Sequence, residues 1–124
     1  MSKKIAMAAQ RIAAGSNKKI EIGDISVKKE WTFAGDIVNA ILTLIEQDTV
    51  FEATLGSGLA YSIEEWLEQC FGLINKNWHD FVIEKNNFVS EYRILVANPE
   101  TIHQLGWQPE VTFPNLAKMM VENK

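Results

Sequence analysis

Hydrophobic and polar positions recur along this chain with two periods, and the longest apolar pattern lies between Lys28 and Gln47. Its apolar residues stand at helical spacing and fill most of a helical circumference: Ile37, Val38, Ala40, Ile41, Leu42, Leu44 and Ile45. Only a narrow stripe stays polar, formed by Asn39, Thr43, Glu46 and Gln47. We therefore expect a helix that begins between Phe33 and Asp36 and is either central to the fold or held against a partner.

Two other segments carry helix-capping signals. Ser62 and Glu65 are spaced as a capping box, in which each side chain accepts a hydrogen bond from the other residue's backbone amide. This box predicts a helix from Ile63 to about Ile74. Asn98 followed by Pro99 predicts a second, brief helix with Asn98 as its N-cap.

Apolar periodicity predicts two more helices. The first runs from Ser2 to Ala14, with Ser2 as N-cap and Gly15 as its stop, and the last runs from Thr112 or Phe113 to about Val121. Alternation of polar and apolar residues predicts a strand at Lys19 to Ile22, and a run rich in β-branched and aromatic residues predicts another at Thr49 to Leu55. Trp78 to Glu84 and Arg93 to Val96 are each compatible with a short strand. The Gly56-Ser57-Gly58 run indicates a tight turn rather than a phosphate-binding loop. This order of elements predicts a mixed α/β (α+β) fold.

Composition narrows the class of protein. A chain of 124 residues with 47% apolar content has the length and composition of one globular domain, so we expect residues 1–124 to form a single domain. The formal net charge of -4 and the scattered basic residues argue against nucleic-acid binding. No apolar run reaches the length of a membrane span, and the lone Cys70 cannot form an internal disulfide. We expect a cytoplasmic protein with no membrane partner, and two isolated histidines do not predict a metal site.

Three phrases of the sequence, taken in order, resemble the carboxyl-terminal part of GDP-mannose 4,6-dehydratases, of the extended short-chain dehydrogenase/reductase superfamily. They are KKIEIGDISVKKEWTFAGDIVNAI, ATLGSGLAYSIEEWLE and ANPETIHQLGWQPEVTFPNLAKMM. The family pattern is a strand ending Leu-Gly-Asn, an Arg-Asp-Trp-Gly segment entering a helix, a Thr-Gly turn before a capped helix, and a Leu-Gly-Trp-Lys-Pro stretch. The resemblance covers nearly the whole chain, and the order and spacing of the phrases make it fairly specific.

Residues that carry this family's chemistry are missing from the sequence. Such enzymes begin with a Rossmann half that holds a glycine-rich dinucleotide fingerprint, and they use a Tyr-x-x-x-Lys pair. Here Tyr61 and Tyr92 are followed four positions later by Glu65 and Val96, and no glycine fingerprint occurs. The resemblance therefore implies the substrate-side part of a dehydratase, with short strands and about five helices but no Rossmann half. On this basis we expect that the chain is not an enzyme by itself and holds no cofactor.

The resemblance also implies where a nucleotide sugar binds. Lys29 falls where the family has the Arg of Arg-Asp-Trp, which contacts the nucleotide diphosphate, and a lysine keeps the charge but not the bidentate fork. The family's Phe-Arg-Pro-Ala-Glu segment corresponds to the segment from Phe88 to Arg93, where Val89 replaces the arginine. Glu91 and Arg93 are the available substitutes. The expected substrate-binding residues are Lys29, Glu91 and Arg93, with no catalytic and no metal-binding residue.

Two functions remain open. The first is a catalytically incomplete GDP-mannose 4,6-dehydratase-like module that binds a GDP-linked sugar weakly. The alternative is a structural or interaction protein, or a fragment, derived from such an enzyme without a retained ligand site. In either case the apolar helix within Lys28 to Gln47 needs cover, so we expect a homodimer or higher oligomer with this helix or the Ser2 to Ala14 helix at the contact. The competing arrangement is a compact monomer, in which the Ser2 to Ala14 helix folds back over the apolar face.

Overall fold

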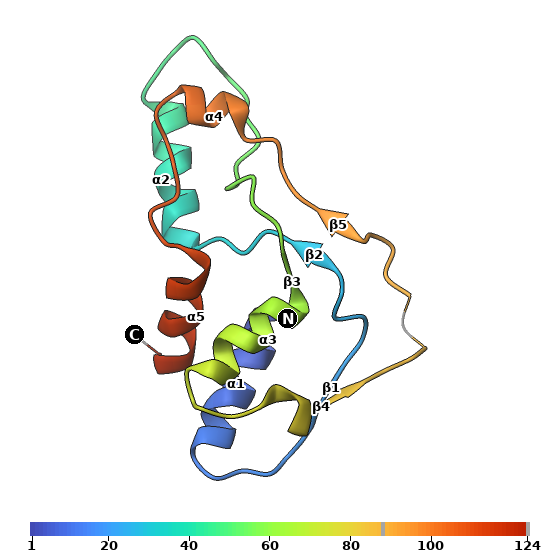
Figure 1. The fold of residues 1–124 in the computed structure, drawn as a ribbon. Helices are drawn as coiled ribbons and strands as arrows, with labels where there is room; N and C mark the ends of the chain where they lie inside the picture. The colour runs from blue at the N-terminus through green and yellow to red at the C-terminus, as the bar shows by residue number, and fades with distance from the viewer. Residues whose placement is uncertain (88, 124) are drawn as a thin grey trace.

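The computed structural model describes residues 1–87 and 89–123, in which helices alternate with very short strands (Figure 1). The helices are α1 (Ser2–Ala13), α2 (Ala34–Ile45), α3 (Ile63–Gly72), α4 (Glu100–Gln104) and α5 (Phe113–Glu122), with a 3-10 turn, η1, at Trp78–Asp80. The strands are β1 (Ile20–Ile22), β2 (Lys28–Lys29), β3 (Tyr61–Ser62), β4 (Val82–Glu84) and β5 (Ile94–Leu95). The predicted mixed α/β class is confirmed.

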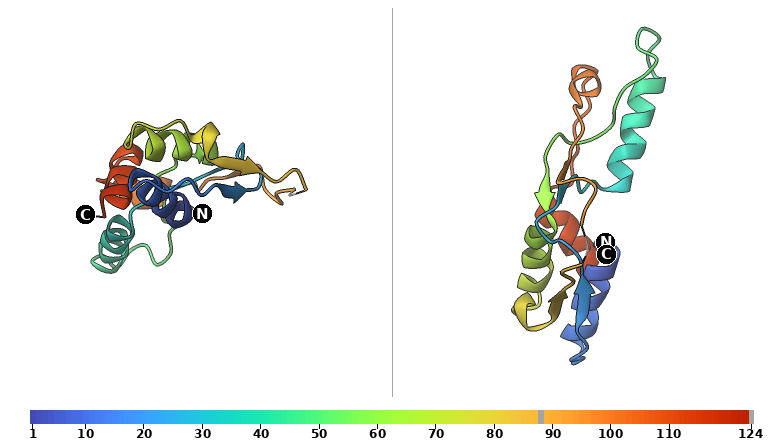
Figure 2. Two further views of the ribbon diagram at one scale, coloured as in Figure 1. Left: turned by 90° about the horizontal axis from the view of Figure 1, so that it is seen from below. Right: turned by 90° about the vertical axis from the view of Figure 1, so that its right-hand side faces the viewer.

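Helices α1, α3 and α5 pack against one another at one end of the molecule and enclose the main hydrophobic core (Figure 2). The buried face of α1 is the predicted one, with Ile5, Ala8, Ala9 and Ile12. An aromatic cluster lies where α3 meets α5: the Trp31 ring stacks on the Trp66 ring with centroids 4.7 Å apart, and the Phe113 ring meets Trp31 edge-on at 6.1 Å. Trp31 and Trp66 therefore anchor the hydrophobic core in this region.

Local capping signals place most helix starts within one residue. The Ser62 hydroxyl oxygen accepts from the Glu65 backbone N–H at 3.0 Å, and the Ser62 N–H donates to the Glu65 carboxylate at 2.6 Å, so the capping box is confirmed. The prediction of Ser2 as N-cap is wrong, because Ser2 is already helical and Met1 occupies the cap position.

The start of α4 shows a similar shift. Pro99 rather than the predicted Asn98 is the N-cap, although the Asn98 side chain still accepts from the Glu100 backbone N–H at 3.3 Å. At α5 the predicted start is confirmed, with the Thr112 hydroxyl accepting from the Asn115 N–H at 3.4 Å.

Two small sheets join the helices. Strands β1 and β4 pair in parallel, with Ile20 opposite Val82. In the second sheet β2 lies between β3, which is antiparallel to it, and β5, which is parallel. The predicted Trp78 to Glu84 strand is split into η1 and β4, and the predicted Arg93 to Val96 strand shrinks to β5.

Helix α2 is not central to the fold, contrary to one of the two arrangements expected from its apolar pattern. It lies at the far end of the molecule beside α4, away from α1, α3 and α5 (Figure 2). Only Asp36 and Ala40 of α2 are buried. Ala40 packs with Ile102 and Trp107 in a second, small hydrophobic cluster. Because α1 packs on α3 and α5 instead, the compact-monomer arrangement with α1 folded over α2 is wrong.

The strand predicted at Thr49 to Leu55 is also absent from the described part of the chain, where these residues form no helix and no strand. A β-prone sequence forms a strand only where a neighbouring strand supplies hydrogen-bond partners, and none lies beside it here. Within residues 1–87 and 89–123, no helix is both long enough and apolar enough to cross a membrane.

Candidate functional site

Lys29 lies on β2, the middle strand of the second sheet, opposite Tyr61 on one side and Leu95 on the other. Its ammonium Nζ lies 4.7 Å from the centroid of the Trp31 ring. That ring is fixed in turn, because the Trp31 Nε1–H donates to the Tyr61 carbonyl oxygen at 2.9 Å and the ring stacks on Trp66. Partial burial lowers the pKa of Lys29. The structure therefore places a half-buried cation on a rigid aromatic support.

Two cavities adjoin Lys29. One, of about 270 Å³, lies between the Gly23 to Val27 turn, the start of α3 and Ser90. The other, of about 400 Å³, lies along the β2-to-α2 connection and reaches α5 at Leu116 and Met120. A ligand group in either cavity could therefore reach the Lys29 side chain.

Arg93 and Glu91 are not gathered around Lys29. The Arg93 carbonyl oxygen accepts from the Lys28 backbone N–H at 2.8 Å, and the Arg93 side chain lines a separate cavity of about 380 Å³ with Lys28, Asp24, Ser26 and Ile94. The structure thus brings Arg93 to Lys28 rather than to Lys29. Glu91 is exposed in the segment before β5. Phe88, with which the predicted binding segment begins, lies outside the described residues.

Asp24 adds a negative charge to the cavity of Arg93. Its carboxylate accepts from the Ser26 hydroxyl at 2.6 Å and from the Ser26 backbone N–H at 2.9 Å. These hydrogen bonds lower the pKa of Asp24, and the charge of Arg93 adds to the lowering. An ionised carboxylate opposes a phosphate beside it. Asp24 also lines the smaller of the two cavities beside Lys29, and Glu30 lines the larger, so each of the three cavities has an acidic side chain in its wall.

Glu30 is a residue of this region that the sequence interpretation missed. Its carboxylate accepts from the Gly58 backbone N–H at 2.6 Å, and the other carboxylate oxygen lies so close to Gly56 that a Cβ there would clash. The Gly56-Ser57-Gly58 run therefore binds a carboxylate of this chain, which supports the turn interpretation over a phosphate loop. Alignment of Lys29-Glu30-Trp31 with Arg-Asp-Trp was the signal that could have drawn attention to Glu30.

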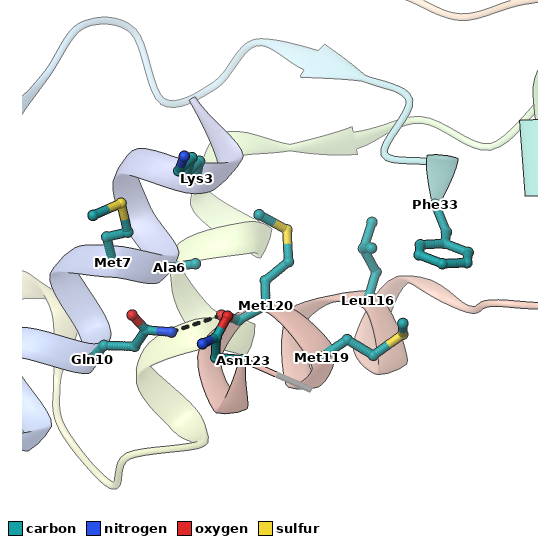
Figure 3. A pocket seen from close by; sticks show the side chains of 9 residues that line it. All are labelled: Lys3, Ala6, Met7, Gln10, Phe33, Leu116, Met119, Met120 and Asn123. Carbon is teal, nitrogen blue, oxygen red and sulfur yellow. Dashed lines mark hydrogen bonds between the residues drawn. The ribbon is translucent and has the colours of Figure 1, made fainter. Parts of the chain in front are cut away.

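A fourth cavity, an apolar groove, lies between α1 and α5 (Figure 3). It has a volume of about 540 Å³, and its lining includes Met7, Met119 and Met120. The Gln10 side-chain amide at its edge donates to the carbonyl oxygens of Met120 and Val121, both at 3.0 Å. Those bonds tie the two helices together. The groove contributes packing rather than acid-base chemistry, because Lys3 is its one titratable side chain among the described residues.

Cys70 is fully buried in α3, where it is part of the main hydrophobic core. Burial raises the pKa of its thiol to about 12, so the sulfur stays protonated at neutral pH and is a poor nucleophile.

Known proteins resemble this chain along nearly its whole length. Residues 1–120 match the model of the family described as GDP-mannose 4,6 dehydratase. GDP-mannose 4,6 dehydratases 1 and 2 of Arabidopsis thaliana are 33% and 32% identical to it, each over 98% of this chain. The match spans only 35% and 34% of those two proteins, so the chain covers about a third of their length.

Solved structures share the fold. RMD of Pseudomonas aeruginosa, complexed with NADPH, superimposes with a TM-score of 0.89 at 20% identity, over 98% of this chain and 41% of that one. dTDP-glucose 4,6-dehydratase of Bacillus anthracis, in complex with NAD, gives 0.76 at 21% identity, over 95% of this chain and 37% of that one. At such identities the likeness shows the fold, which is that of part of an extended short-chain dehydrogenase/reductase.

These matches correct one expectation. The sequence led us to expect that the chain is not an enzyme by itself. This assignment to a non-enzyme class is wrong, because the matching family model and the curated relatives are GDP-mannose 4,6-dehydratases, which are enzymes. The fold, the order of its motifs and the match over residues 1–120 agree. The chain belongs to the GDP-mannose 4,6-dehydratase family.

Proposed function

We propose that this chain supplies the nucleotide-sugar-binding part of a GDP-mannose 4,6-dehydratase, and that Lys29 contacts the diphosphate of a GDP-linked sugar. The observation that carries the proposal is the position of Lys29, which is held over the Trp31 ring on the middle strand of a sheet and adjoins two cavities. In this proposal the residues of this chain bind and orient the sugar nucleotide, and the whole dehydratase carries out the dehydration of GDP-mannose.

Partial burial makes Lys29 suited to this role. An ammonium in a medium of reduced dielectric constant attracts an anion more strongly than one in bulk water does. A bound diphosphate also favours the charged form of the amine and so reverses the lowering of its pKa. A lysine is a point charge, without the two-pronged geometry of an arginine, so we expect a contact that positions the diphosphate weakly.

Arg93 and Glu91 have secondary roles in this proposal. Arg93 directly precedes β5, and its backbone is hydrogen-bonded to Lys28 of the adjacent strand β2. In this position its positive charge favours the binding of an anion near β2 without a direct contact between Arg93 and the anion. Glu91, exposed before β5, is available to accept hydrogen bonds from the nucleotide. Because Arg93 is solvent-exposed, its contribution should fall as salt rises.

Ligand-observed NMR provides the test. We expect saturation transfer to GDP-mannose and to GDP, with GDP displacing GDP-mannose, and weaker transfer to UDP-glucose. Transfer that is equal for all three ligands would contradict selective binding. No transfer at millimolar ligand would favour the alternative of an interaction protein without a ligand site.

The homodimer or higher oligomer expected from the sequence stays a prediction. Its premise holds, because α2 does expose apolar side chains, whereas the α1 helix is already packed within the same chain. Exchange of α1 between subunits would have to break that packing, so contact through α2 is the form of self-association that we retain for testing.

A further inference from the structure

The corner between α1 and β1 concentrates positive charge in a chain whose formal net charge is -4. A fifth cavity, of about 630 Å³, opens there, and four basic side chains line it: Lys4, Arg11, Lys18 and Lys19. The α1-to-β1 connection, which carries two of them, lies at the end of the molecule opposite α2 (Figure 2). None of the residues proposed to bind the nucleotide sugar lines this cavity.

The backbone that carries Lys18 and Lys19 is ordered. Gly15 follows the end of α1 with a φ of 103°, and the Ser16 N–H donates to the Arg11 carbonyl oxygen at 3.1 Å. The Ser16 hydroxyl then accepts from the Lys18 N–H at 3.2 Å. These bonds fix where the backbone presents the two lysines relative to Arg11.

The positive charge of the cavity is not neutralised by the part of the chain that the structure describes. Within 1–87 and 89–123, none of the four lining cations takes part in an ion pair. Glu21 is the one acidic side chain in the described lining, and its carboxylate is paired with Lys85 at 3.0 Å. The Lys4 ammonium donates to the Glu21 backbone carbonyl oxygen, which is a neutral group. An excess of positive charge therefore faces the cavity.

The three cavities around β2 have a different balance of charge. In each of them, one acidic side chain stands against one or two basic side chains. The cavity at the α1–β1 corner sets four cations against one carboxylate that is already paired. A concave surface lined by charges of one sign raises the local concentration of ions of the opposite sign. This corner is therefore the better place for a highly charged anion.

The spread of the cations indicates the kind of anion. Lys4 and Arg11 are seven positions apart on α1, which is about 10 Å along the helix axis. A single phosphate cannot contact both ends of such a row. All four side chains are exposed, and an exposed cation binds an anion weakly because water and salt screen the pair. Useful affinity needs an anion that meets several of these cations at once.

We propose that the α1–β1 corner is a second anion-binding site, which takes a small polyphosphate: a chain of two or more phosphate groups, free or carried by a nucleotide. The Arg11 guanidinium matches two oxygens of one phosphate, and Lys18 and Lys19 add point charges beside it. Ile20 and Ile83 give the cavity a neutral apolar wall that does not repel the anion. The inference does not rest on nucleotide-sugar binding at Lys29.

Calorimetric titration of the whole chain with inorganic tripolyphosphate tests the proposal. We expect binding that is stronger than that of orthophosphate by about 10-fold or more and that weakens as salt is raised. The combined substitutions Arg11→Gln, Lys18→Gln and Lys19→Gln should weaken it by about 10-fold or more. The matched control removes the same charge from exposed positions outside the cavity, by Lys3→Gln, Lys76→Gln and Lys118→Gln, and should stay within about 3-fold.

Two further titrations identify the source of the phosphate chain. Lys29→Ala should leave the affinity for tripolyphosphate unchanged, and GTP titrated into that variant should bind at least as tightly as tripolyphosphate. Equal weakening by the two triple variants would overturn the proposal, because binding would then follow net charge alone. Equal affinities for orthophosphate and tripolyphosphate would also overturn it, as would tighter binding of a hexaglutamate peptide.

Nuclear magnetic resonance of the unmodified chain covers the case of a triple variant that folds poorly. Tripolyphosphate should shift the amide signals of Arg11 and of residues 16–21, and it should leave those of residues 28–31 in place. Shifts confined to residues 28–31 would overturn the second site. GDP-mannose, added in a separate titration, should shift residues 28–31, so failure of the Lys29 site and failure of the α1–β1 site are read at different residues.

Discussion

The indole Nε1–H of Trp107 donates a 2.9 Å hydrogen bond to the backbone carbonyl oxygen of Asp36, although the two residues are 71 positions apart. The Asp36 carboxylate, only 3% exposed, accepts in turn from the backbone N–H groups of Glu110 and Val111 at 3.1 and 3.0 Å. These bonds fix the first turn of α2 to the Leu-Gly-Trp stretch. They explain how a helix that buries little of its apolar surface stays in place.

Asp36→Ala should therefore destabilise the chain. The substitution leaves two backbone donors without their acceptor, which costs about 1 to 3 kcal/mol in the free energy of unfolding. Asp48→Ala removes an exposed carboxylate and should change that free energy by no more than about 0.5 kcal/mol. Urea unfolding followed by circular dichroism measures both. Equal effects of the two substitutions would mean that the Asp36 bonds do not hold α2.

The cap of α3 gives a second prediction. Ser62→Ala removes the hydroxyl that accepts from the Glu65 N–H and should lower the free energy of unfolding by about 1 kcal/mol. Ser2→Ala is the matched control, because Ser2 makes no capping hydrogen bond in α1 and its replacement should have an effect below about 0.5 kcal/mol. A larger loss for Ser2→Ala than for Ser62→Ala would show that the caps are wrongly assigned.

Cys70 should be unreactive in the folded chain. A thiol with a pKa of about 12 in the core is protonated at neutral pH and shielded from reagents. A disulfide reagent should modify it at least about 100-fold more slowly in native buffer than in urea at the same pH. The release of the reagent's chromophore measures the rate, and similar rates in the two solutions would contradict the buried position.

Local signals in the sequence were sufficient where the determining contacts are local. The capping box of Ser62 and Glu65 acts within one turn, and it placed α3 correctly. The alternation from Lys19 to Ile22 likewise predicted β1. The strand predicted at Thr49 to Leu55 failed because β-propensity describes a residue's fitness for a sheet and not the presence of a neighbouring strand.

The sequence did not predict how elements far apart in the chain are placed relative to one another. The apolar pattern of α2 predicted burial of several sides of the helix, but it did not predict that the side carrying Val38 would be exposed to solvent. At the candidate site, the resemblance identified Lys29, whereas the pairing of β2 with β5 decides that Arg93 adjoins Lys28 instead. Glu30 was missed because its role depends on the approach of Gly58, 28 positions away.

Isothermal titration calorimetry with GDP-mannose tests the central claim most directly, that Lys29 holds the diphosphate of a GDP-linked sugar. We expect binding by the unmodified chain that weakens as salt is raised. Lys29→Ala should reduce the affinity by about 10-fold or more, while Lys118→Ala, which removes an exposed charge on α5, should leave it within about 2-fold. Binding that survives Lys29→Ala unchanged, or that falls equally with Lys118→Ala, would contradict the assignment of the site to Lys29.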